Sequence, residues 1–508
     1  MAVYNHGARV LEKPTSAVAP ITGTAGLQVV FGTAPVNLAD NPLGVTNVPI
    51  LCYTWAEAVS KLGYSDDYDK YTLCAAMYAS FQLFRVAPVI FVNVLDPTVH
   101  KRVNTAADVD VESLQATVSV EGILPSSVDV KMVTTTPPAQ EGGDPTETLT
   151  PLAVNTDYVL SFSDSGYLVI TLTASGAGAT ATKLRVASTS IDPSAVTMND
   201  VIGVSANGAE KGMETLRQVY PRFGLTPGLL LAPGWSHIPD VGIALAAKCV
   251  EINGVFSCEA LIDIDSRDSG CTVYSNVKTA KENAGCTSSR VMALWPCVTV
   301  GSRKFWLSAI MGALTAYTDA SNDDVPNVSP SNALLGVTGT VLAEAVYDAA
   351  SGTWSKEVFL DQVQGNAVNS FGVTTAINNN GWRSWGNNTA AYPGTTDPKD
   401  RWFSCRRFFS WWGNSFILTY AQRVDSPANR QLIESIVDAE NIWGNAYVAA
   451  GKCAAAYIEF DETENTTQTL LDGQIRFHQH LAPFTPAEDI LNTLEFDPDA
   501  LAAALNGG

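Results

Sequence analysis

The sequence predicts an α/β core domain with a mostly parallel sheet, an inserted all-β domain, and an α+β C-terminal domain with extended N- and C-terminal arms. Three observations support this fold class. Short apolar runs alternate with helical stripes over residues 27–97 and again over 211–317, which is typical of α/β units. The segment between these two stretches is rich in Val, Thr and Ser and has no helical stripe. Farther on, seven of the eleven tryptophans lie between residues 354 and 443, which indicates a third unit with a different amino-acid composition.

We predict that residues 1–22 form an N-terminal arm that lies outside any compact core. Prolines at positions 14 and 20 prevent a helix here, and unanchored chain ends are commonly extended. The extended pattern comprises Val3, Tyr4, His6, Ala8 and Val10.

The first part of the core spans residues 23–101. It opens with a buried strand at 27–33. Thr54 and Glu57 have the spacing of a capping box, so we expect a helix from this point that ends at Gly63. The apolar run at 88–97 is bounded by prolines, and a run buried on both faces indicates a central parallel strand.

The second part of the core spans residues 209–350 and continues the alternation. A helical stripe begins at Met213 and is expected to stop at Pro221, because proline interrupts a helix. A second stripe begins at Leu307. The other expected elements are strands at 228–233, 254–265 and 290–296 and helices at 239–250 and 273–285.

Residues 102–208 form the predicted all-β insertion. Two strands joined by a turn are expected within 157–173, whereas the Pro-, Gly- and Thr-rich stretch 134–151 has the composition of a loop. Insertions succeed at exposed loops, so this domain should project outward.

Residues 351–508 form the predicted C-terminal domain. Its longest helix is expected to start with Ser426 as the cap and Pro427 at the first position. Two strands are expected after it, at 452–462 and 473–484.

The composition argues against several classes of function, namely nucleic-acid binding and membrane insertion. The net charge is −21 with a pI near 4.6, which argues against direct contact with nucleic acid. No run approaches the ~18 apolar residues of a membrane span, and the N-terminus lacks an apolar leader. We therefore expect no stable membrane insertion, no signal peptide and synthesis in a cytoplasm. The nine cysteines include no C-x-x-C pair, which favours buried reduced thiols over disulfides.

The crevice at the carboxyl ends of the predicted α/β strands is the candidate site for catalysis. Ligands bind outside the carboxyl ends of strands in α/β sheets, and Ser236, His237 and Asp263 lie at such ends. These side chains could serve nucleophilic catalysis, so a hydrolase-like enzyme is the alternative hypothesis. However, the sequence has no G-x-S-x-G elbow, no Gly-rich phosphate loop after a strand and no H-E-x-x-H. We therefore expect no enzyme activity, catalytic residue or cofactor.

The stretch GQIRFHQH at 473–480 contains two of the five histidines. On a strand, His478 and His480 share a face with Arg476, whose fixed positive charge disfavours a metal cation. We predict a linking strand and no metal site. Its residues are Ile475, Arg476, Phe477, His478, Gln479, His480 and Leu481.

Several stretches together resemble the contractile tail sheath proteins of contractile phages and phage-tail-like bacteriocins. The resemblance covers most of the chain outside 102–208. Its motifs are GTAPVNL (32–38), EAVSKLGYS (57–65), YTLCAAMYASFQLFRVAPVIFVNVLDP (71–97), KGMETLRQVYPRFGLTPGLLLAPGWSHIPDV (211–241), ALIDID (260–265), ALTAYTDASNDDVPNVSPSN (313–332), RSWGNNTAAYP (383–393) and VDSPANRQLIESIV (424–437).

The resemblance implies a structural subunit of a contractile injection system. Such subunits polymerise helically around an inner tail tube protein in a metastable extended state, then contract to drive the tube through a cell envelope. It also implies baseplate and terminator proteins as partners, and a place in a virion tail or tail-like particle. The arm at 3–10 and the strand at 473–482 would exchange strands between subunits, which is a form of β-augmentation. The C-terminal domain would lie near the tube.

Overall fold

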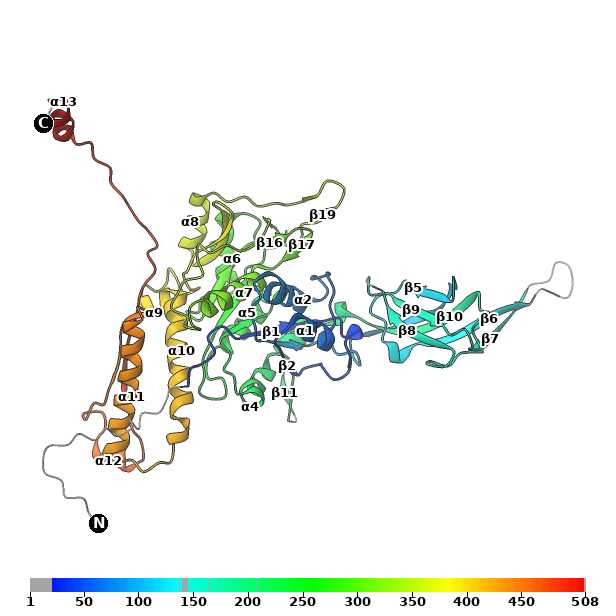
Figure 1. Ribbon diagram of the computed structural model, residues 1–508, viewed down its shortest axis with the longest axis horizontal. Helices are drawn as coiled ribbons and strands as arrows, with labels where there is room; N and C mark the ends of the chain where they lie inside the picture. The colour runs from blue at the N-terminus through cyan, green and yellow to red at the C-terminus, as the bar shows by residue number, and fades with distance from the viewer. Residues whose placement is uncertain (1–20, 137, 139–144, 164, 207, 507–508) are drawn as a thin grey trace, which may run out of the picture.

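The computed structural model describes residues 21–136, 138, 145–163, 165–206 and 208–506. Figure 1 shows a central α/β body with a β module projecting from one side. A pair of long helices stands on the opposite side, and a thin C-terminal segment runs away from the body.

An eight-stranded mixed sheet forms the centre of the body. Five of its strand pairings are parallel, and the two outermost pairings are antiparallel. The strands lie in the order β2 (Pro49–Cys52), β3 (Val89–Asn93), β1 (Gln28–Gly32), β13 (Leu229–Leu231), β14 (Glu259–Asp263), β15 (Val291–Leu294), β21 (Val373–Asn378) and β22 (Trp382–Trp385).

Helices cover both faces of this sheet. Gly312 of α7 (Leu307–Ala320) lies against Leu231, whereas Gly242 of α5 (Pro239–Ala247) lies against Ile262. Leu231 is in register with Leu261, the residue before Ile262. Successive side chains on a strand point to opposite faces. The two helices therefore pack on opposite faces, which explains why β1, β3, β13 and β14 are buried throughout.

Thr54 caps α1 (Trp55–Leu62) as predicted, but the return bond of Glu57 goes to the residue before the cap and not to the cap itself. The Thr54 hydroxyl accepts from the Glu57 backbone N–H at 3.2 Å, and the Glu57 carboxylate accepts from the Tyr53 N–H at 2.9 Å. Gly63 follows the helix with a φ of 73°, a conformation that favours glycine. A Cβ there would lie 2.2 Å from the Pro35 carbonyl oxygen.

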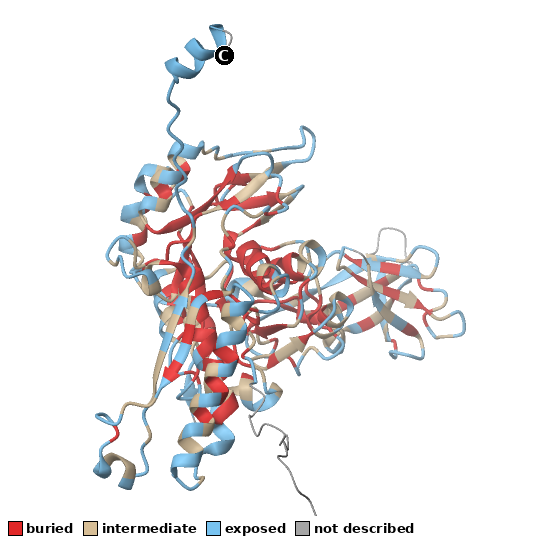
Figure 2. Cartoon of the chain, turned by 60° about the vertical axis from the view of Figure 1, so that its left-hand side comes forward, coloured by how far each residue is buried: buried red, intermediate tan, exposed pale blue. Residues whose placement is uncertain are grey.

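The β module consists of two sheets with a hydrophobic core of their own, formed by side chains such as Val130, Ile170 and Leu184. Figure 2 shows buried residues concentrated in the α/β body, with a smaller set inside this module. One sheet has the order β4 (Lys101–Asp110), β10 (Lys183–Ile191), β6 (Asp129–Thr136), β7 (Thr146–Pro151), and the other has the order β5 (Gln115–Val118), β9 (Leu168–Leu172), β8 (Tyr158–Phe162).

Three expectations from the sequence are wrong in detail. The stretch 134–151 is not one loop, because its ends belong to β6 and β7, whose Thr-rich sequence suits a pleated surface. Pro221 lies inside α4 (Val219–Phe223), which ends at Gly224. Proline is tolerated there because first-turn N–H groups have no intrahelical partner. The long helix α11 (Arg430–Ala449) is capped by Asn429, whose side chain accepts from the Leu432 N–H at 2.8 Å, and not by Ser426.

The central sheet extends beyond residue 350, where the sequence suggested that the core ends. β21 pairs in parallel with β15, and β22 pairs with β21. The local sequence pattern does not indicate this strand, because half of Val373–Asn378 is Thr and Asn.

The C-terminal part packs two long helices beside a two-stranded sheet (Figure 1). Its elements are α9 (Pro398–Arg401), α10 (Phe403–Tyr420), α11, β23 (Cys453–Glu459), α12 (Thr467–Leu471), β24 (His478–Pro483) and α13 (Pro498–Leu505).

The remaining elements are short and surround the body. All nine cysteines are free and buried, as expected from their spacing. Across the described ranges, no helix is both long and apolar enough to cross a membrane. The short elements are α2 (Thr72–Met77) with the π-helical turn η2 (Tyr78–Leu83), α3 (Met198–Ile202), the 3-10 helix η5 (Gly212–Gln218), α6 (Val277–Asn283), α8 (Gln362–Ser370), and the strands β11 (Ser205–Ala206), β12 (Ala209–Glu210), β16 (Cys297–Val300), β17 (Arg303–Phe305), β18 (Gly339–Val341), β19 (Tyr347–Asp348) and β20 (Thr353–Trp354).

Candidate functional site

The polar residues at the carboxyl ends of β13 and β14 form hydrogen bonds that lead to the first turn of helix α7. The Ser236 hydroxyl donates to Asp263 at 3.1 Å. Asp263 also accepts from the backbone N–H of Ser308 at 2.9 Å and from its hydroxyl at 2.5 Å. Ser308 lies in the first turn of α7, where N–H groups need outside acceptors and a carboxylate is favoured.

The histidine of this crevice is not placed to activate the serine. The ring of His237 stacks on Trp306, with centroids 4.4 Å apart and planes 4° apart. Burial lowers the pKa of His237 to about 4, and burial raises the pKa of Asp263 to about 6. A general base must touch the proton that it removes, yet the Ser236 hydroxyl is directed to Asp263. The hydrolase alternative therefore has no support.

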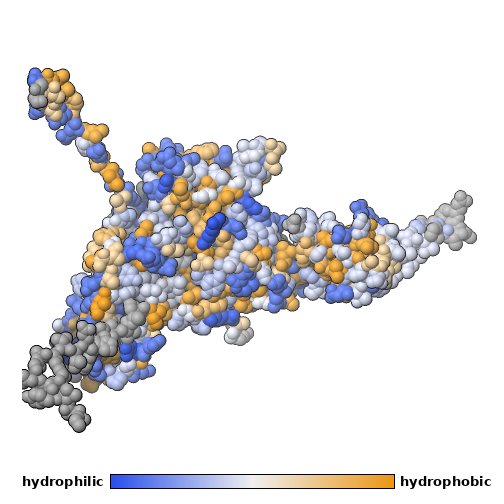
Figure 3. Space-filling view, in the orientation of Figure 1, coloured by the Kyte–Doolittle hydropathy of each residue, from blue (hydrophilic) through white to orange (hydrophobic). Residues whose placement is uncertain are grey.

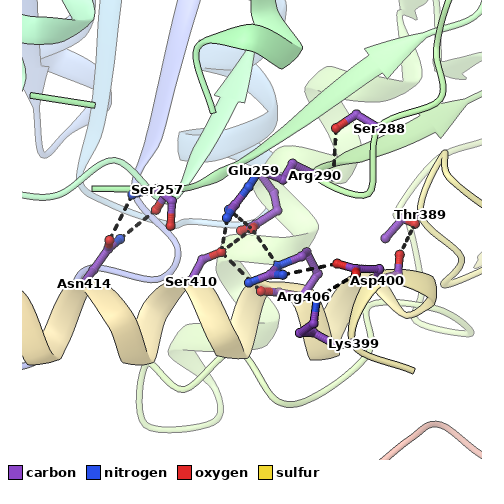
Figure 4. Close-up of polar contacts among 10 residues, drawn as sticks. All are labelled: Ser257, Glu259, Ser288, Arg290, Thr389, Lys399, Asp400, Arg406, Ser410 and Asn414. Atoms are coloured by element: carbon purple, nitrogen blue, oxygen red, sulfur yellow. Dashed lines mark hydrogen bonds and ion pairs between the residues drawn. The ribbon is translucent and has the colours of Figure 1, made fainter. Parts of the chain in front are cut away.

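Helix α10 is joined to the amino-terminal edge of the central sheet by buried polar groups (Figure 4). Glu259, at the start of β14, accepts from the Ser410 hydroxyl at 2.5 Å and from Arg290 at 3.3 Å. One turn farther along α10, Asn414 both donates to and accepts from the backbone of Ser257, at 2.7 and 3.0 Å. We call these contacts, with the ion pair described next, the α10 seam.

The deepest part of the α10 seam is an ion pair between Arg407 and Asp319. The two side chains are 2% and 1% exposed. Arg407 donates to both carboxylate oxygens of Asp319 through separate nitrogens and also to the Ala25 carbonyl at 2.9 Å. Such bidentate geometry gives the strongest charge-assisted hydrogen bonds. The pair connects α10 to the end of α7 and to the chain just before β1.

The first described residues run along α10. The Ile21 N–H donates to the Thr419 hydroxyl at 2.9 Å, and the Gly23 N–H donates to the Ser415 hydroxyl at 2.8 Å. The indole of Trp411 donates to the Gly23 carbonyl at 2.9 Å. The N-terminal segment therefore enters the body along α10.

Residues 1–20 of the predicted N-terminal arm lie outside the described residues. This applies to all of its predicted contact positions, which are Val3, Tyr4, His6, Ala8 and Val10.

Helix α11 packs on α10 through aromatic rings. Trp412 and Trp443 have ring centroids 4.1 Å apart, and Trp411 and Tyr447 join the same cluster. Beside it, the carboxyl group of Glu440 is fully buried, and neither of its oxygens has a hydrogen-bond partner among the described residues. Burial raises the pKa of Glu440 to about 7. A buried carboxyl without a partner is costly when ionised, so we expect the contact between the two helices to weaken when this group loses its proton.

β24 pairs antiparallel with β23 of the same chain. The strand begins at His478, five residues after the predicted start at Gly473, because Arg476 is bonded elsewhere. Its N–H and its carbonyl bond the side chain of Asn465, both at 2.8 Å. Leu481 packs toward the tryptophan cluster, as the predicted alternation of faces requires.

The two histidines of β24 bind separate carboxylates. His478 lies 2.9 Å from Glu464. His480 lies 3.0 Å from Glu459 and stacks on Tyr457 with centroids 4.6 Å apart. Among the described residues, no group of three or more His, Cys, Asp or Glu side chains could hold a metal ion. The stretch is a half-exposed strand, and each of its histidines contacts a carboxylate of its own.

The β23–β24 sheet has only two strands within the described part of the chain. Each strand therefore has one edge whose N–H and C=O groups face no strand. On β23 this edge meets α11, because the Asn441 side chain bonds the N–H and the carbonyl of Ile458 at 2.8 and 3.1 Å. The outer edge of β24 is a template on which another strand can pair, so it is the candidate site for contact with another chain.

The C-terminal arm, which we define as residues 484–508, leaves the body after β24 (Figure 1). Its apolar side chains Ile490, Leu491, Leu494 and Phe496 are 77–87% exposed. Figure 3 shows hydrophobic residues along this arm and on its terminal helix. A soluble surface seldom exposes such a cluster unless another molecule covers it.

The sequence analysis missed these arm residues. The signal was available as the pattern I-L-x-x-L-x-F in a short acidic segment between Pro486 and Pro498. Prolines at both ends argue against a long helix there, which would otherwise have given these side chains a helix face to pack with.

Comparison with known proteins gives consistent matches. No family model matches the chain. The tail sheath protein of Burkholderia phage BcepMu is 26% identical, and the match covers 100% of this chain and 99% of the relative. The tail sheath protein of Escherichia phage P2 is also 26% identical, over 58% of this chain and 70% of the relative.

Solved structures agree in fold. The sheath of an extracellular contractile injection system, the PVC sheath complex in its contracted state, has a TM-score of 0.56 at 14% identity, covering 98% of this chain and 99% of that chain. The helical sheath of the anti-feeding prophage in its contracted state has a TM-score of 0.54 at 15% identity, covering 98% and 100%.

Proposed function

This chain is a contractile tail sheath protein, a structural protein and not an enzyme, and from that premise we propose that it polymerises helically around an inner tube. The assembled array would be metastable and extended, and its contraction would drive the tube through a target cell envelope. The observation that carries the proposal is the match along the whole chain to a phage tail sheath protein.

Strand exchange between copies is the proposed means of assembly. The β23–β24 sheet offers the outer edge of β24, and the arm at 3–10 would add a strand to this edge in a neighbouring copy. The linking contacts would involve residues 475–481 and the C-terminal arm. Head-to-tail contacts that do not close into a ring generate a helical filament, and main-chain bonds in an added strand supply affinity.

We propose the following division of labour along the chain. Residues 102–208 would form an outward-facing domain, since its strands have a core of their own. The α/β core would comprise 23–101 and 209–350 together with the strands β21 and β22. The C-terminal part, α9 to α13, would lie near the inner tube.

The proposed partners follow from this arrangement. They are other copies of this chain, the inner tail tube protein, and baseplate and terminator proteins at the two ends of the sheath. The protein would reside in a virion tail or tail-like particle assembled in a bacterial cytoplasm.

Electron microscopy of the purified protein at increasing concentration tests the proposal. We expect long tubes or helical polymers. Deleting residues 1–12 should leave a folded subunit that no longer assembles. Discrete, closed small oligomers at every concentration would overturn the proposed function, and normal assembly of the truncated chain would overturn strand exchange by the N-terminal arm.

A further inference from the structure

Arg401 is held in a pocket of aromatic and amide groups beside the start of α10. Its Nε donates to the Asn388 side-chain oxygen at 3.0 Å. Its guanidinium carbon lies 3.9 Å from the centre of the Trp402 ring and 4.6 Å from that of Tyr392. The backbone closes the pocket, since the Thr389 N–H donates to the Arg401 carbonyl at 2.7 Å. We call Asn388, Tyr392, Arg401 and Trp402 the arm socket.

The free end of Arg401 binds the C-terminal arm. Its Nη2 donates to Glu488 Oε2 at 2.6 Å, and the Asn388 amide lies 3.4 Å from Glu488 Oε1. Within the described chain, this is the last polar contact between the arm and the body. Residues 489–497 then continue without regular structure to α13.

This contact differs from an ordinary surface ion pair. A flexible arginine loses rotamer freedom when it forms a pair, which is one reason why exposed pairs contribute little. Here the guanidinium is already fixed by two rings and an amide, so little more freedom is lost when Glu488 binds. The GNNTAAYP stretch at 386–393 supplies Asn388 and Tyr392 of this pocket. Holding Arg401 in place is therefore a role for this stretch.

We propose that the arm socket fixes the exit of the C-terminal arm and so directs residues 489–508 toward a second copy of this chain. The inference rests on the proposed function, in which this arm links copies. Nine extended residues reach at most about 30 Å, so the exit direction decides which surfaces α13 can meet. Restricting that direction raises the effective concentration of the arm at its acceptor.

The test compares Glu488→Gln with Glu495→Gln. Both remove one charge from the arm, but Glu495 lies beyond the last contact with the body. Arg401→Lys is a second variant, because it keeps the charge and loses the planar group. A chain that ends at Glu488 tests the linking role of the arm itself.

Two readouts are measured. The first is the protein concentration at which tubes form, followed by sedimentation and microscopy. We expect Glu488→Gln and Arg401→Lys to raise it about fivefold, the factor that corresponds to about 1 kcal/mol, and Glu495→Gln to leave it unchanged. The second is the distribution of distances between spin labels at Gln362→Cys and Asn492→Cys, which should broaden in the two socket variants. The native cysteines are buried, so label goes to the introduced sites.

The outcomes are distinguishable. If the chain ending at Glu488 fails to assemble while Glu488→Gln matches the unmodified protein in both readouts, the arm links copies but the socket does not direct it. If the chain ending at Glu488 assembles like the full chain, the linking role of the arm fails, and the inference fails with it.

Discussion

The two ends of the C-terminal part are built in opposite ways. At the α10 seam, charged groups such as Arg407 and Asp319 are buried and paired with each other. At β24 and the arm, a strand edge and apolar side chains are open. Buried paired charges tolerate little displacement, whereas open edges gain stability when another chain binds. The comparison indicates a subunit that is stiff at the α10 seam and that keeps a strand edge and apolar side chains available for binding at β24 and the arm.

The largest expected effect is at the buried ion pair. Arg407→Ala removes a cation and leaves Asp319 buried and unpaired, which should lower the free energy of unfolding by about 3–5 kcal/mol. Urea titration of the unassembled subunit measures this. The control is Arg430→Ala, which removes an arginine 91% exposed and paired with Glu434 four residues on. It should cost at most about 0.5 kcal/mol. Equal losses in the two variants would contradict a stiff α10 seam.

The next effect depends on pH and concerns the contact between α10 and α11. The unfolded Glu440 carboxyl ionises near pH 4.5, but burial holds its proton in the folded chain up to about pH 7. The folded state therefore binds more protons between these values, and stability falls as pH rises from 4.5 to 7. The resulting loss in the free energy of unfolding is about 3 kcal/mol, and it is complete above pH 7.

Glu440→Gln isolates this titration. Relative to the unmodified chain, the variant should gain stability on going from pH 5 to pH 8, as measured by urea unfolding at both values. Glu434→Gln is the matched control, because it lies on the exposed face of the same helix. If the pH profiles of Glu440→Gln and the unmodified chain run parallel, Glu440 does not control the helix contact.

A smaller effect on stability is expected where α11 packs against the β23–β24 sheet. A Cβ at Gly444 would lie 2.1 Å from the Ala456 carbonyl oxygen of β23, so Gly444→Ala should push the strand away and cost about 1–3 kcal/mol. At Gly413 of α10, a Cβ would meet nothing within 4 Å. Gly413→Ala should instead stabilise the helix by about 0.5–1 kcal/mol. Thermal unfolding of both variants decides this, and a stabilised Gly444→Ala protein would refute close packing at that point.

The sequence predicted the body better than its attachments, for a physical reason. Buried parallel strands and capped helices leave local patterns, as at Thr54 and in the run 88–97. The α10 seam leaves none, because Arg407 and Asp319 are 88 positions apart and each resembles a surface residue in sequence. Partnership over such a distance depends on tertiary packing.

The same reasoning explains the errors in element boundaries. β21 lies in the central sheet although half of it is Thr and Asn, since burial there is decided by its neighbour β15. Asn429 caps α11 although Ser426 followed by Pro427 has the better local signature. Residues such as Ser, Asn and Asp suit caps almost equally well, so tertiary geometry selects among them.

The smallest effect is expected at the histidines of β24. His480→Gln removes a half-exposed pair with Glu459, so it should lower the free energy of unfolding by at most about 0.5 kcal/mol. Because each histidine binds its own carboxylate, Zn²⁺ or EDTA should shift the Tm by less than about 1 °C. A clear rise of Tm with Zn²⁺ that is lost in His480→Gln would contradict the prediction that this stretch holds no metal site. Without such a rise, the histidines contribute only their local contacts, and the outer edge of β24 stays available for the proposed strand pairing.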